Sequence, residues 1–145
     1  MFSFEGAKLG KLHFVYLSRG EKVLESIQEE IDRCGVKQGI MLSAIGSARK
    51  MVYHRISKII DENSDEFLTV EAPVEIGAIQ GLIIDGKPHL HVTFSDLENT
   101  YTGHLEPGCE IQYLAEIVFA EIEDAPIMRK YTETGVGYLC MKDET

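Results

Sequence analysis

The sequence has few cysteines, few basic residues and no long apolar run, and each shortage excludes a class of protein. Its three cysteines, Cys34, Cys109 and Cys140, are widely spaced and form no Cys-x-x-Cys pair. This argues against a disulfide framework and predicts reduced thiols in a cytoplasmic protein. No segment has the roughly 20 consecutive apolar residues that a membrane-spanning helix needs. The first residues also lack a basic stretch followed by an apolar one, so we expect no secretion signal.

Basic residues are fewer than acidic residues in this chain. The chain has 14 lysines and arginines against 24 acidic residues, a net charge of −10. Proteins that bind DNA usually gather basic side chains into a patch that contacts phosphates. The closest approach to such a patch is Arg49-Lys50 with Arg55 and Lys58, and strand alternation would spread these side chains over both faces. The composition therefore disfavours a nucleic-acid partner.

Several catalytic motifs are also absent. The sequence contains no glycine-rich phosphate loop and no nucleophile elbow. What remains is typical of a soluble globular protein, with 44% hydrophobic and 26% charged residues over 145 residues. No repeat, low-complexity segment or linker divides the chain, so residues 1–145 are predicted to form a single domain.

The hydrophobic periodicity predicts an α+β domain, with one main helix early in the chain and then mostly antiparallel strands. Apolar residues between Val23 and Cys34 recur at helical spacing, Cys34 is expected to be buried, and Gly35 is placed to end the helix. The run from Gly39 is expected to close in a turn at Gly46-Ser47. Strands are predicted at 12–17, 39–47, 51–60, 74–84, 88–95, 100–105, 111–122 and 136–141, with a polar loop at 61–66 and a hairpin turn at Asp85-Gly86.

Three of the five histidines lie within 16 residues, at His89, His91 and His104. His89 and His91 are two apart on a predicted strand, so both side chains point to the same face. If 97–99 closes a hairpin, residues whose numbers sum to about 195 lie opposite one another. His104 then faces His91, with His89 diagonal to it. His13 and His54 have no such neighbours in sequence and are treated as isolated packed or exposed residues.

Two interpretations of this cluster stay open. The three imidazoles could hold a divalent transition metal, zinc by default, and leave a fourth position free for water, a substrate or a small-molecule ligand. They could equally form a structural hydrogen-bonding cluster in a metal-free protein. The metal interpretation allows a zinc-dependent enzyme that activates water, although the sequence identifies no catalytic residue.

Three further residues are candidates for the surroundings of this site. Glu116 lies in an apolar run, where an unpaired buried carboxylate is costly. It is therefore either on a solvent-facing side of its strand or paired with a cation or histidine, and pairing beside the histidines is favoured. Ser43 and Gly46 belong to a small-residue segment that could cradle a ligand, although a tight turn explains them as well.

Several segments together resemble the plants-and-prokaryotes-conserved (PPC) domain. They are Gly86-Lys87-Pro88-His89-Leu90-His91-Val92, Gly103-His104-Leu105 with Gly108-Cys109, Arg19-Gly20-Glu21, and Leu42-Ser43-Ala44-Ile45-Gly46-Ser47. The resemblance spans roughly residues 12 to 122, and it identifies the chain as a stand-alone prokaryotic member.

The resemblance implies a compact domain around an antiparallel sheet, and assembly into a homotrimer. For function it implies less. In plants the domain is fused to Arg-Gly-Arg-Pro motifs that enter the DNA minor groove, and this sequence has none. Three functions therefore stay open: a homotrimeric module with a metal or small-ligand site, a zinc-dependent enzyme, and a DNA-associated regulator as the family label suggests.

Overall fold

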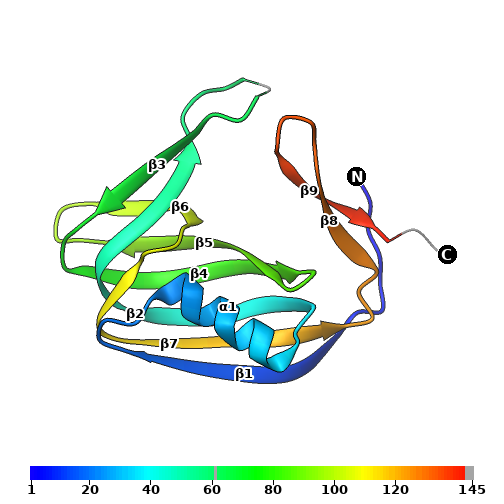
Figure 1. Ribbon diagram of the computed structural model, residues 1–145, viewed down its shortest axis with the longest axis horizontal. Helices are drawn as coiled ribbons and strands as arrows, with labels where there is room; N and C mark the ends of the chain where they lie inside the picture. Colours follow the sequence, from blue (N-terminus) through cyan, green and yellow to red (C-terminus); the bar gives the residue numbers. More distant parts are fainter. Residues whose placement is uncertain (61, 143–145) are drawn as a thin grey trace.

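Residues 1–60 and 62–142 are described by a computed structural model, which has one helix and mostly antiparallel strands (Figure 1). The elements, in chain order, are β1 (Lys8–Ser18), α1 (Val23–Cys34), β2 (Gln38–Ile56), β3 (Asp65–Val70), β4 (Val74–Ile84), β5 (Lys87–Ser95), β6 (Thr100–Leu105), β7 (Glu110–Glu123), β8 (Ile127–Tyr131) and β9 (Gly137–Met141). The predicted antiparallel sheet with a single early helix is confirmed, although strands dominate more than the term α+β suggests.

The main sheet has the order β1-β7-β2-β4-β5-β6, with β3 paired to β2. All of its pairings are antiparallel, and β6 also returns to the C-terminal part of β2, where Tyr53 lies opposite Leu105. Strand β2 is therefore the hub, because it pairs with β7 and β4 along its first part and with β3 and β6 along its last. The hairpin β8-β9 forms a separate two-stranded sheet that stands to one side of the main sheet (Figure 1).

The core forms where α1 lies across the sheet (Figure 1). Val23, Ile27 and Ile31 are spaced by four residues, so they share one helix face, and each is 1% exposed or less. From the sheet, Phe119, Met51 and other apolar side chains complete the core. Burying each of these large side chains stabilises the fold by about 1.5–3 kcal/mol.

The two hairpins predicted in the second half are confirmed. Asp85 and Gly86 both have positive φ, as a two-residue hairpin turn requires, and Ile84 pairs with Lys87 on either side of them. The next hairpin aligns His91 with His104, the register predicted from the position of the turn.

Other parts of the sequence-based assignment need correction. The segments 39–47 and 51–60 are one continuous strand, β2, which ends at Ile56. Gly46 lies inside β2 instead of in a turn, and glycine is required there because a Cβ would lie 2.5 Å from the Leu114 carbonyl oxygen. Strands β3 and β8 were not predicted, and Cys34 is exposed instead of buried. Within the described residues, no helix is long and apolar enough to span a membrane.

Candidate metal centre

Strand alternation places His89 and His91 on the outer side of β5. Between and beyond them Leu90, Val92 and Phe94 are each 1% exposed or less and point into the core. Because side chains alternate along a strand, the two histidines both point to the opposite side, away from the core. Their ring centroids lie 5.6 Å apart.

Strand pairing then brings a third and a fourth histidine to the same place. His104 on β6 lies opposite His91, and on its other side it lies opposite His54 of β2. The His104 ring centroid is 4.9 Å from that of His89, 5.6 Å from that of His91 and 4.5 Å from that of His54. We call these four residues the histidine cluster. The sequence analysis identified three of them and missed His54.

A glycine permits this close approach of β6 to β2. A Cβ at Gly103 would lie 2.5 Å from the His54 carbonyl oxygen and 2.7 Å from a ring carbon of Tyr53. No side chain fits at that separation, so only glycine allows β6 to approach β2 here. The residue directly before His104 therefore helps to set the distance between the His54 and His104 rings.

Glu106 is the acid of the cluster. Its Oε1 lies 2.6 Å from Nδ1 of His54 and 3.0 Å from Nδ1 of His104, so both rings can donate to one carboxylate oxygen. On the far side of His54, Oδ2 of Asp65 is 3.6 Å from Nε2. A carboxylate that accepts from Nδ1–H leaves Nε2 of that ring as the free lone pair. Glu106 thus sets the orientation and tautomer of His104.

Two of the imidazoles are held in the neutral form. Burial lowers the pKa of His89 to about 4, and the positive charge of Arg129 contributes in the same direction. Burial also lowers the pKa of His104, with a further contribution from His54. Both rings are therefore neutral at physiological pH, which is the form that ligates metals.

A cavity of about 720 Å³ opens beside the histidine cluster. It lies between the segment that joins β2 to β3 and the β8-β9 hairpin, the two parts that face each other at the top of Figure 1. Three histidines, three cations, two acids and several apolar side chains line it, including His54, His89, His104, Lys58, Lys87, Arg129, Glu62, Asp65, Ile56, Ile59, Tyr131 and Val136. A ligand in this cavity would contact the cluster directly.

The other candidates of the sequence analysis do not join this site. Glu116 is exposed on β7, in register with Ile45 on one side and Tyr16 on the other. The acid beside the histidines is instead Glu106, to which no role was given from the sequence. Ser43 and Gly46 lie within β2 where it pairs with β7, and neither lines the cavity. The close approach of β2 to the Leu114–Ala115 backbone explains Gly46 structurally.

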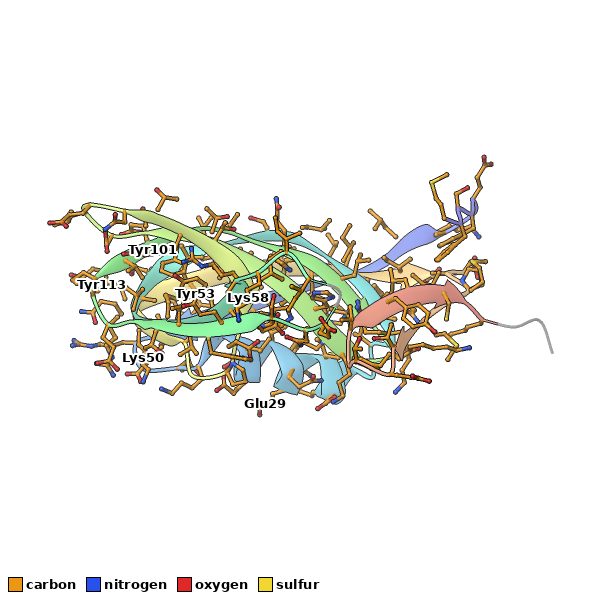
Figure 2. The ribbon with its side chains drawn as sticks, turned by 90° about the horizontal axis from the view of Figure 1, so that it is seen from above. Glu29, Lys50, Tyr53, Lys58, Tyr101 and Tyr113 are labelled. Carbon is orange, nitrogen blue, oxygen red and sulfur yellow. The ribbon has the colours of Figure 1, made fainter. Side chains whose placement is uncertain are left out.

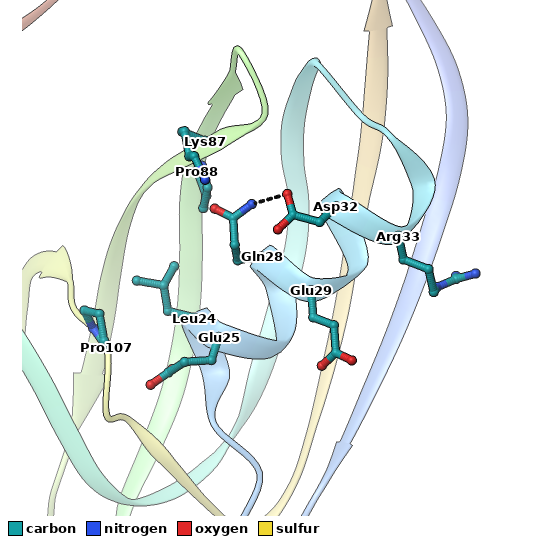
Figure 3. Close-up of a pocket in the computed structure, with 9 residues that line it drawn as sticks. All are labelled: Leu24, Glu25, Gln28, Glu29, Asp32, Arg33, Lys87, Pro88 and Pro107. Atoms are coloured by element: carbon teal, nitrogen blue, oxygen red, sulfur yellow. Dashed lines mark hydrogen bonds between the residues drawn. The ribbon is translucent and has the colours of Figure 1, made fainter.

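A second hollow of about 830 Å³ lies along α1 and is lined differently. Figure 3 shows Glu25, Glu29 and Asp32 on the helix, with Pro88 and Pro107 across from them. The amide of Gln28 donates to Asp32 at 2.9 Å and to the Gly86 carbonyl at 3.0 Å, which ties the helix to the β4-β5 turn. The hollow brings no histidine or cysteine together with its acids, so we give it no chemical role.

Comparison with known protein families finds a match over most of the chain. The model of the Plants and Prokaryotes Conserved (PCC) domain matches residues 4–123. Among curated proteins, the chain is 32% identical over 120 residues to the bifunctional protein GlmU of a Synechococcus strain. That match covers 79% of this chain but only 18% of the much longer relative.

Solved structures share the whole fold. A metal-containing protein from Archaeoglobus fulgidus is 26% identical, with a TM-score of 0.78 over 97% of this chain and 99% of that one. A proposed DNA-binding protein from Bacteroides thetaiotaomicron is 16% identical, with a TM-score of 0.77 over 94% of this chain and 99% of that one. The second likeness is one of fold alone.

Proposed function

The chain belongs to the Plants and Prokaryotes Conserved domain family, and on that premise we propose that it is a metal-binding member in which His89, His91 and His104 hold one divalent transition metal. The observation that carries this proposal is the spacing of the three rings, whose centroids are 4.9–5.6 Å apart. Imidazoles bound tetrahedrally at about 2.0–2.1 Å from zinc place their ring centroids roughly 5 Å apart. The centroid separations thus match those of three imidazoles on one ion, but the ligand nitrogens of the triad do not all lie within 4.8 Å of one another, so the rings would turn on binding.

Zinc suits this donor set best. Neutral imidazole nitrogens bind zinc, copper, nickel and iron, and zinc is the commonest with three histidines and an open position. The low pKa of His89 supports ligation, because its ring does not have to lose a proton to bind. The Archaeoglobus relative, described as metal-containing, adds support at 26% identity.

His54 and Glu106 offer a competing arrangement. One ligand atom from each of His54, His104 and Glu106 lies within 4.8 Å of the others. However, the His54 and His104 rings are stacked, with an interplanar angle of 20°, and both face Glu106. Rings that share an ion converge on it instead of stacking. We therefore assign Glu106 the role of a carboxylate that orients His104, with His54 held on the same oxygen.

The experiment is to measure zinc per chain after reconstitution, in wild type and in His91→Ala. The proposal expects His91→Ala to lose one equivalent, because His91 belongs to the proposed triad and not to the competing set. Gln80→Ala is the matched control, since Gln80 lies opposite His91 on β4 and should keep the wild-type zinc content. Equal zinc in His91→Ala and wild type, or none in either, would reject the triad.

The adjacent cavity supports a role in which the metal contacts a small molecule. Three protein ligands leave one coordination position open, and the cavity reaches His89 and His104. Such a metal could simply bind the ligand, or it could activate water as in a zinc-dependent enzyme. Screening small molecules against the metal-loaded protein would distinguish binding from turnover.

Self-association into a homotrimer is the second part of the proposal. Exposed apolar side chains gather on one face of β1, β7 and β2, including Phe14, Tyr16, Leu114 and Ile45. Tyr16, Glu116 and Ile45 are directly in register across the three strands. An apolar face of this kind commonly marks a protein interface. The apolar side chains of β4, such as Ile76 and Ile79, are instead buried in the chain's own core.

Association with DNA has weaker support. The basic residues that could form a patch are engaged with acids: Arg49 with Glu110, Lys50 with Glu71, and Arg55 with Glu66. Figure 2 places Lys50 toward one end of the molecule, apart from Lys58. Lys58, Lys87 and Arg129 line the cavity beside the histidine cluster, but with a net charge of −10 the long-range field opposes approach to duplex DNA.

A further inference from the structure

A second group of metal-ligand atoms lies where α1 packs against the sheet, built from residues outside the histidine cluster. His13 comes from β1, Glu30 and Cys34 are one turn apart on α1, and Glu121 comes from β7. A ring nitrogen of His13, a carboxylate oxygen of Glu30 and Sγ of Cys34 lie within 4.8 Å of one another.

The Oε1 atom of Glu30 is the centre of this group. It lies 3.5 Å from Nδ1 of His13, and the Cys34 thiol donates to it at 3.2 Å. Donors bound tetrahedrally to zinc, at about 2.0–2.1 Å for nitrogen and oxygen and 2.3 Å for sulfur, are roughly 3.3–3.5 Å apart. The two separations therefore already match those of a bound ion.

The orientation of His13 is set by residues around it. Its side chain is only 8% exposed, and its ring stacks on Phe119 with centroids 4.7 Å apart and an interplanar angle of 8°. Nε2 lies 3.0 Å from Oε1 of Glu121, which can accept its proton. A carboxylate on one ring nitrogen fixes the tautomer and leaves the other nitrogen to ligate. In His13 that other nitrogen is Nδ1, which points toward Glu30 and Cys34.

We propose that His13, Glu30 and Cys34 form a second divalent transition-metal site, of the zinc type, independent of the histidine cluster. A neutral imidazole, a carboxylate and a thiolate together balance a 2+ ion. On binding, the Cys34 thiol releases its proton to solvent and an S–metal bond replaces the S–H···O contact with Glu30. Cys34 is exposed, so ions can enter there and water can occupy a fourth position.

Arg33 completes the surroundings of the site. Its Nε donates to Oε2 of Glu30 at 2.8 Å and its Nη2 to Oε1 at 2.7 Å. With 69% of its side chain exposed, Arg33 can keep the Oε2 contact while its Nη2 moves away and frees Oε1 for the metal. The alternative is a metal-free network in which the two ring nitrogens of His13 bridge Glu30 and Glu121.

Cobalt titration distinguishes the proposed metal site from the metal-free network, because a thiolate ligand gives a sulfur-to-cobalt charge-transfer band in the near ultraviolet. We expect the band in wild type and in His91→Ala, whose histidine cluster is impaired. Cys34→Ser should abolish it, whereas Cys140→Ser, which removes another free cysteine, should retain it. Glu121→Gln acts only through His13 and should weaken cobalt binding about 10–100-fold with the band still present at saturation.

Circular dichroism of each variant monitors the fold, and Cys34 is exposed enough for serine to be accommodated. Absence of the band in wild type at saturating cobalt would overturn the proposal, as would a band that survives Cys34→Ser. Because the band reports sulfur ligation, loss of zinc from the histidine cluster cannot imitate either result.

Discussion

One oxygen of Glu106 faces Nδ1 of both His54, at 2.6 Å, and His104, at 3.0 Å. Fifty-two residues of chain separate Glu106 from His54, and the pairing of β2 with β6 brings them together. By accepting from Nδ1 of His104, this shared carboxylate would leave Nε2 of that ring as the nitrogen available to a metal.

The Glu106→Gln substitution tests that dependence. A neutral amide cannot stabilise Nδ1–H as well, so we expect zinc affinity at the histidine cluster to fall about 10–100-fold while some binding remains. Competition with a chromogenic chelator measures the affinity. Glu116→Gln is the matched control, since Glu116 is exposed on β7, and it should bind zinc as wild type does. Equal affinities in the two variants would contradict the role given to Glu106.

The metal-free protein should lose stability in acid. The folded-state pKa of His89 is lowered to about 4 from 6.5, so between these values the unfolded chain binds more protons than the folded chain. The free energy of unfolding should therefore fall as the pH drops from 6.5 toward 4, by on the order of 1 kcal/mol for this partly solvent-screened ring. Urea unfolding at several pH values measures it. His89→Gln should flatten the dependence, and an unchanged slope would argue against this assignment.

Assembly should depend on the apolar face of β1. Phe14 is 75% exposed on that face, so Phe14→Glu would place a charge inside the proposed trimer interface. We expect light scattering to give a trimer mass for wild type and a lower mass for Phe14→Glu at micromolar concentration. Leu97→Glu is the control, because Leu97 is exposed in the β5-β6 turn away from that face. A monomeric wild type would reject the trimer.

DNA binding should be weak. At about 150 mM salt the screening length is only about 8 Å, so the few cations around the cavity, Lys58, Lys87 and Arg129, act at short range and do not compensate for the net charge of −10. Fluorescence anisotropy with a labelled duplex should show no submicromolar binding. Tight binding that weakens steeply as salt is raised would show that basic residues contact phosphates after all.

Gly46 should be intolerant of any side chain. A Cβ there would meet the Leu114 carbonyl oxygen at 2.5 Å and Ala115 Cα at 2.7 Å, so Gly46→Ala must push β2 and β7 apart. We expect a loss of about 2–4 kcal/mol in the free energy of unfolding. Gly77→Ala is the control, because the nearest atom to its Cβ is 3.8 Å away, and it should cost less than about 1 kcal/mol. Similar losses in both would refute the close-approach argument.

Local patterns were enough to predict the parts of the site that depend on local geometry. The period of two in β5 put His89 and His91 on one face, and the turn at 97–99 set the register that aligns His104 with His91. The same reasoning located α1 and the Asp85-Gly86 turn. In each case the interacting residues are close in sequence, so a spacing rule connects them.

Tertiary structure brings together residues that lie too far apart in the sequence for a spacing rule to connect them. His54 joins the cluster and meets Glu106 only because the long strand β2 runs on past Gly46 and pairs with β6, a contact between distant segments. Glu116 lies away from it because β7 pairs with β1 and the first part of β2. His13 and Cys34 likewise meet only where α1 packs on the sheet. Side-chain alternation is a property of a single strand, whereas the choice of partner strand depends on burying the whole core at once.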